Sequence, residues 1–136
     1  MTDSLVARRI LVVEDELIVS WLLEDMLANL GCIVVGPAAR VVQALEMVEA
    51  LDIDAAVLDV CLNEQFSYPV ADALIARRVP FIFATGYDRA RLRHEYSSYS
   101  VLQKPFHASD LDAALLKLFP QAGQGIKTGT AVASVP

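Results

Sequence analysis

The chain has 136 residues, of which 55% are hydrophobic and 21% are charged, and its formal net charge is −6. This length suits one well-packed domain. The net negative charge argues against nucleic-acid binding, because contact with a phosphate backbone needs clustered Lys and Arg. No apolar run approaches the roughly 20 residues of a membrane span, and no signal peptide opens the sequence. We therefore expect a cytoplasmic protein that neither spans a membrane nor binds nucleic acid.

Short apolar runs alternate with longer stretches of helical spacing after residues 1–8, which we expect to form a short lead-in. The apolar runs predict strands buried on both faces of a sheet, and the stretches between them predict helices. In chain order we predict a strand over 9–13, a helix over 16–30, a strand over 33–35, a helix over 41–51, a strand over 55–58, a helix over 69–77, a strand over 81–84, a poor helix over 88–96, a strand over 101–103 and a helix over 109–118.

Five strands alternating with five helices predict an α/β fold with a doubly wound parallel sheet in the flavodoxin-like order 2-1-3-4-5. Residues 9–119 then form a single domain. Residues 120–136 are rich in Gly, Ala, Thr and Ser, which predicts a flexible tail.

In the first helix, a spacing of four residues predicts a buried face. That face consists of Ile18, Leu22, Met26 and Leu30, and we expect Trp21 to pack as well.

Isolated polar residues stand where the apolar runs end. Glu14 and Asp15 follow the first strand, and Lys104-Pro105 follows the fifth. Asp59 ends the third apolar run and Thr85 ends the fourth. Because sites in open α/β sheets form at the carboxyl ends of the strands, we expect these side chains to converge on one patch.

The acidic residues of this patch suit a magnesium site. Mg²⁺ prefers oxygen ligands and keeps several waters, so Asp15 and Asp59 are candidate ligands, with Glu14 assisting through a water molecule. A second interpretation stays open for the acidic run 14–16, whose charges also favour the N-terminus of the following helix.

Asp59 suits a nucleophile that accepts a phosphoryl group as an acyl phosphate, although a carboxylate at this position also caps turns. Phosphoryl transfer needs its negative oxygens neutralised and held in place. Lys104 supplies a flexible cation and Thr85 a hydroxyl donor. Gly86 has no side chain to block access to the phosphoryl group.

Taken together, these residues resemble the receiver domain of two-component response regulators, over about residues 8–119. The motifs that carry the resemblance are Glu14-Asp15, Asp59, Thr85 and Lys104-Pro105. The resemblance implies that Asp59 is the phosphoacceptor, that Thr85 and Lys104 contact the phosphoryl group, and that the backbone carbonyl of Cys61 completes the Mg²⁺ ligands. It also implies a sensor histidine kinase or a histidine phosphotransferase as the phosphodonor.

The stretch Pro80-Phe-Ile-Phe-Ala-Thr-Gly-Tyr87 is similar to the FATGUY-type single-domain response regulators. Those regulators act by protein–protein contact or as phosphate sinks. Many receivers carry a rotating aromatic three residues before the Lys, and here that position is Val101. We therefore expect Tyr87 to share the signalling role with the predicted helix 88–96; an ordinary loop tyrosine is the alternative.

Two other functions stay open. An Mg²⁺-dependent aspartyl-phosphate phosphatase usually shows Asp-x-Asp, whereas this chain has Asp59-Val-Cys61. The second is a pseudo-receiver that works without phosphorylation. The intact set of signature residues argues against it. An FMN carrier is disfavoured, because the acidic run 14–16 would repel its phosphate. We expect a phosphoprotein that slowly loses its phosphate and is not a turnover enzyme. The sequence leaves open the identity of the kinase, the downstream partner, the sign of the output and whether the protein forms a weak homodimer.

Overall fold

The computed structural model describes residues 3–86 and 92–119. Its main sheet has five parallel strands in the order β2-β1-β3-β6-β7. The strands are β1 (Arg9–Val13), β2 (Ile33–Ala38), β3 (Ala55–Asp59), β6 (Phe81–Thr85) and β7 (Val101–Gln103). Since β6 and β7 are the fourth and fifth predicted strands, the predicted order 2-1-3-4-5 is confirmed.

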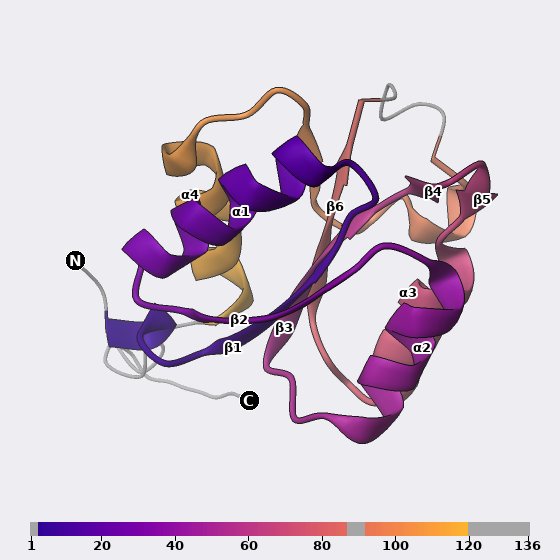
Figure 1. Ribbon diagram of the computed structural model, residues 1–136, viewed down its shortest axis with the longest axis horizontal. Coiled ribbons are helices and arrows are strands. Elements are labelled where there is room, and N and C mark those ends of the chain that lie inside the picture. Colours follow the sequence, from indigo (N-terminus) through magenta and orange to yellow (C-terminus); the bar gives the residue numbers. More distant parts are fainter. Residues whose placement is uncertain (1–2, 87–91, 120–136) are drawn as a thin grey trace.

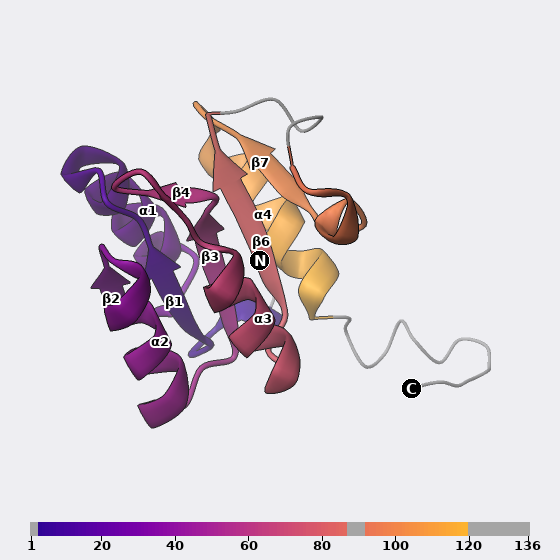
Figure 2. The same cartoon turned by 90° about the vertical axis from the view of Figure 1, so that its right-hand side faces the viewer.

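Helices cover both faces of this sheet, as Figures 1 and 2 show, with α1 and α4 on one face and α2 and α3 on the other. The helices are α1 (Leu17–Asn29), α2 (Val41–Ala50), α3 (Tyr68–Ala76) and α4 (Ala108–Leu118), with short 3₁₀ helices η1 (Asp3–Leu5) and η3 (His94–Tyr96). The fold is therefore the doubly wound α/β arrangement that the sequence predicts. No helix among the described residues is long and apolar enough to cross a membrane.

The sheet separates two hydrophobic cores because successive side chains of a strand point to opposite faces. In β1, Ile10 and Val12 pack into the core under α1 and α4. Leu11 and Val13 pack into the core under α2 and α3. The second core also includes Leu58 of β3. Strands buried on both faces have no polar alternation, which explains why they read as continuous apolar runs.

The predicted buried face of α1 is correct for Met26 and Leu30, which are half-buried and pack against the core, and wrong for Ile18 and Leu22. Ile18 and Leu22 are exposed, with 69% and 54% of their surface accessible, and Trp21 is 59% exposed. The helix buries Leu23 and Leu27 instead, together with the small Ser20. This leaves a group of large apolar side chains on the surface, which we call the α1 patch. Its members are Leu17, Ile18, Trp21 and Leu22.

A small hairpin follows β3 in a stretch for which the sequence analysis predicts neither a strand nor a helix. Its strands are β4 (Cys61–Leu62) and β5 (Gln65–Phe66), which pair antiparallel. Asn63 and Glu64 form the turn with φ of 48° and 67°. Two consecutive positive φ values are what a tight two-residue hairpin turn needs. Asn adopts this conformation readily, whereas Glu gives no sequence signal for it.

The predicted helix over 88–96 is only partly observable. Residues 88–91 lie outside the described residues, as does Tyr87. The described remainder contains the 3₁₀ helix η3 over His94–Tyr96 and no α-helical turn. Residues 120–136, predicted as a tail, also lie outside the described part of the chain.

Candidate functional site

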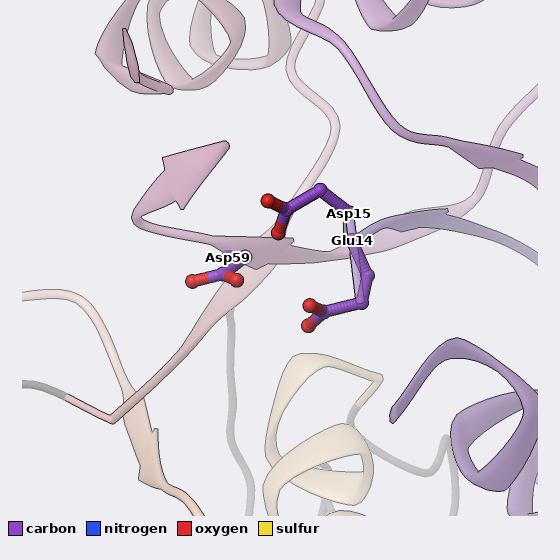
Figure 3. A group of neighbouring side chains, drawn as sticks. All are labelled: Glu14, Asp15 and Asp59. Carbon is purple, nitrogen blue, oxygen red and sulfur yellow. The ribbon is translucent and has the colours of Figure 1, made fainter. Parts of the chain in front are cut away.

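The carboxyl ends of β1 and β3 bring three carboxylates together. Val13 of β1 pairs with Leu58 of β3, so the residues that follow each of them lie side by side. Glu14, Asp15 and Asp59 each offer one oxygen, and these oxygens all lie within 4.8 Å of one another. Figure 3 shows the three side chains pointing toward a common space. The structure thus confirms that these three acids converge.

Lys104 is the cation of the cluster. Its Nζ donates to Glu14 Oε1 at 2.8 Å and to Asp59 Oδ2 at 3.1 Å. It also pairs with Glu16 Oε1 at 3.6 Å. The backbone N–H of Lys104 donates to the carbonyl of Thr85 at 2.8 Å, which fixes the lysine beside the end of β6. The ammonium group thus bridges two carboxylates whose side chains are almost fully buried.

Burial decides the protonation of these groups. It raises the pKa of Glu14 from 4.5 to about 7; the hydrogen bond from Lys104 opposes this rise and the charge of Asp59 adds to it. Burial also raises the pKa of Asp59, against the opposing charge of Lys104. For Lys104, burial lowers the pKa, but the hydrogen bond to Glu14 and the charge of Asp59 outweigh it, so the pKa is raised. Burial therefore disfavours the charged forms of Glu14 and Asp59, and Lys104 offsets only part of this effect.

Neighbouring backbone groups hold two of the acids in place. The N–H of Asn63 donates to Asp15 Oδ2 at 2.9 Å. The N–H of Cys61 lies 3.4 Å from Asp59 Oδ1. The hydroxyl of Ser67 donates to the backbone carbonyl of Asp59 at 2.5 Å. The sequence reasoning missed Asn63 and Ser67, because their roles depend on the hairpin turn and on the entry into α3.

The remaining predicted site residues lie around this cluster. Thr85 ends β6 and is buried, and Gly86 follows it with no atom within 4 Å of the place where a Cβ would stand. Lys104 and Pro105 line an open pocket of about 400 Å³ together with Gly86. Val101 begins β7 and is half-buried. Tyr87 is outside the described residues.

The donor set fits a hard divalent cation. Mg²⁺ takes oxygen ligands in an octahedron and is commonly held by one or two carboxylates. Asp15 and Asp59 offer such oxygens, and the three carboxylates lie close enough together to share one cation. The same Asp59 carboxylate contacts Lys104, so one group faces both a cation site and an ammonium group. This combination stabilises negative charge on a transferred phosphoryl group.

Comparison with known proteins agrees with this geometry. The chain is 29% identical over 117 residues to the transcriptional regulatory protein PdtaR of Mycobacterium tuberculosis, covering 83% of this chain and 57% of that protein. The chain therefore spans little more than half the length of the curated relatives it matches.

Two solved structures resemble the fold closely. SdrG from Sphingomonas melonis Fr1 is 42% identical, with a TM-score of 0.75 and coverage of 87% of this chain and 98% of that one. The receiver domain of the sensor histidine kinase PA1611 from Pseudomonas aeruginosa, with a magnesium ion in its active-site cleft, is 28% identical, with a TM-score of 0.68 and coverage of 82% and 97%. Residues 10–116 match the response regulator receiver domain. The chain thus belongs to the response regulator receiver domain family.

Proposed function

We propose that this protein is a phosphorylation-dependent signalling switch in which Asp59 accepts a phosphoryl group from a sensor histidine kinase or a histidine phosphotransferase. The observation that carries the proposal is the position of Asp59. Its carboxylate is almost fully buried, lies 3.1 Å from the Nζ of Lys104 and shares a cation-sized space with two further carboxylates. A carboxylate in such a site is a suitable nucleophile for phosphoryl transfer.

Asp15, Asp59 and the backbone carbonyl of Cys61 would hold Mg²⁺, with Glu14 assisting through water. When bound, Mg²⁺ neutralises charge on the phosphoryl oxygens. The transfer itself breaks the P–N bond of the phosphohistidine and forms a P–O bond to one Asp59 oxygen. The imidazole keeps the electron pair of the broken bond. Lys104 and the Thr85 hydroxyl hold the transferred oxygens, and Gly86 leaves the approach open.

We also propose that the chain works as a FATGUY-type regulator, which acts by protein contact or as a phosphate sink. Val101 supports this, because a valine cannot perform the rotation of the aromatic that stands there in many receivers. Tyr87 and Pro105, which flank the site in sequence, are then candidate switch residues. We expect no catalytic turnover, because no second acid follows at the position where aspartyl-phosphate phosphatases carry one.

The test is incubation with Mg²⁺ and a small phosphodonor, followed by the intact mass of the wild type and of Asp59→Asn. We expect one phosphoryl adduct on the wild type and none on the variant, because the amide is no nucleophile for this transfer. Continuous release of phosphate without a trapped adduct would indicate a phosphatase. A wild type without any adduct and without Mg²⁺ binding would indicate a pseudo-receiver.

The α1 patch is a candidate docking surface for the phosphodonor. Exposed apolar patches of this kind are typical of protein interfaces. The pocket beside Lys104 is also lined by Leu22 and Met26 of α1, so the patch continues into the rim of the site. A protein that brings a phosphohistidine to Asp59 has to cover this rim. We therefore propose that the donor contacts the patch with an apolar surface of its own.

The double variant Ile18→Ser, Trp21→Ala tests this surface. We expect about tenfold slower phosphotransfer from the histidine kinase that phosphorylates the wild type fastest, since buried aromatic anchors carry much of an interface's binding energy. Phosphorylation by a small phosphodonor should be unchanged. The matched control is Val42→Ser, which removes an exposed apolar side chain from α2. Equal slowing with both donors, or equal slowing in the control, would contradict the proposal.

A further inference from the structure

Tyr68, the first residue of α3, is the centre of an aromatic cluster beside the site. Its ring stacks on Tyr96 with centroids 4.6 Å apart and planes 9° apart. It also stacks on Phe66 of the hairpin at 5.5 Å and meets Phe83 of β6 edge-on at 6.4 Å. Stacked and edge-on pairs each stabilise a fixed arrangement of rings. One buried side chain thus contacts three separate elements near the site.

Polar contacts attach the segment around η3 to this cluster. The N–H of Arg93 donates to the Tyr68 hydroxyl at 3.1 Å, and the Arg93 guanidinium lies 4.5 Å from the centre of the Tyr68 ring. The Tyr96 hydroxyl donates to Asp72 of α3 at 2.6 Å. Burial and this hydrogen bond raise the pKa of Tyr96 to about 12, so the hydroxyl keeps its proton at neutral pH. The start of α3 therefore positions η3.

The same start of α3 is tied to the phosphoacceptor. Ser67, directly before Tyr68, is fully buried. Its hydroxyl donates to the carbonyl of Asp59, and its N–H donates to the carbonyl of Val60 at 2.8 Å. Asp59 is thus one hydrogen bond away from the residue next to Tyr68. This bond directly connects the Asp59 backbone to the start of α3.

We propose that Ser67 and Tyr68 couple the phosphorylation state of Asp59 to the position of the segment around η3. This inference rests on the proposed function and names the route by which that site is read out. The coupling uses the entry to α3, whereas Val101 on β7 offers no aromatic ring for this purpose. An allosteric change requires residues that link a ligand site to an element with two alternative positions, and Ser67 and Tyr68 link Asp59 to the segment around η3 in this way.

Hydrogen–deuterium exchange of the backbone amides over residues 92–99 tests the coupling, with and without beryllofluoride and Mg²⁺ as a phosphoryl mimic. In the wild type we expect the mimic to change this exchange by about fivefold, a shift in the range of local opening equilibria. In Ser67→Ala and in Tyr68→Leu the change should fall below about twofold at a mimic concentration that saturates each variant. Binding is measured separately by ¹⁹F NMR.

The control is Tyr99→Leu, which removes a ring of the same kind that stacks on Phe81 at 4.8 Å instead of on Tyr68. It should keep the wild-type response. Tyr68→Phe, which keeps the ring and loses the hydroxyl that accepts from Arg93, should give an intermediate response and guards against misfolding of Tyr68→Leu. A full response in Ser67→Ala, with the mimic bound, would overturn the coupling alone. A wild type that binds no mimic would overturn the proposed function and this inference with it.

Discussion

Replacing Lys104 with alanine is expected to lower the free energy of unfolding by about 3 kcal/mol near pH 8, because removing one partner leaves buried charges uncompensated. The lysine side chain is 14% exposed, and its two carboxylate partners are 1% and 9% exposed. Without the ammonium group, Glu14 and Asp59 face each other with no cation between them. Urea unfolding without added metal measures this loss.

The same variant should slow phosphorylation by a small phosphodonor by roughly a hundredfold, a magnitude common when a donor to the developing charge is removed. The lysine is the only described ammonium group that contacts Asp59. The rate is measured by intact mass at saturating Mg²⁺, per folded molecule, so that the stability loss does not enter. A variant with reduced stability and an unchanged rate would assign Lys104 a structural role only.

Two control variants separate charge from shape. Lys104→Arg keeps the positive charge and should recover most of the stability, but less of the rate, because a planar guanidinium does not reproduce the contacts of an ammonium group. Lys117→Ala removes an exposed lysine from the last turn of α4 and should leave both quantities within experimental error.

The strand order was predictable because every central strand is buried on both faces, so its apolar run has no polar interruption. The inward face of α1 was not predictable in this way. Six of the seven residues from Leu17 to Leu23 are apolar, so any line of side chains along that turn looks like a core face. Packing against the sheet selects Leu23 and Leu27, and it accommodates the small Ser20 between them.

The site was predictable to the extent that its residues end strands. Asp59 and Lys104 follow from strand ends and parallel pairing, because carboxyl ends of neighbouring strands meet at one edge. Ser67 and Tyr68 were missed because they lie in the loop and the helix start after β3. Their roles depend on the hairpin at Asn63, whose positive φ no apolar pattern signals. Residues positioned by loop geometry leave no periodic trace in a sequence.

Replacing Glu14 with glutamine is expected to stabilise the protein, and the gain should grow with pH. The folded state raises the pKa of Glu14 from 4.5 to about 7. Between these values the folded chain binds more protons than the unfolded chain, so the unfolding free energy of the wild type falls as pH rises. Glutamine does not ionise and avoids this fall. We expect a gain of about 2 kcal/mol near pH 8 and little gain near pH 4.5.

The measurement is urea unfolding at both pH values without metal, with Glu49→Gln as the control. Glu49 is 84% exposed and pairs with Arg77 at 3.9 Å, so its replacement should change the free energy of unfolding by no more than about 0.5 kcal/mol. Adding Mg²⁺ should shrink the gain from Glu14→Gln, because the cation neutralises the same charge. An equal gain at both pH values would contradict the prediction, since ionisation of the buried Glu14 carboxylate would then not be its cause. Buried carboxylates at the strand ends favour the binding of a cation, because the cation stabilises their ionised forms in the folded state.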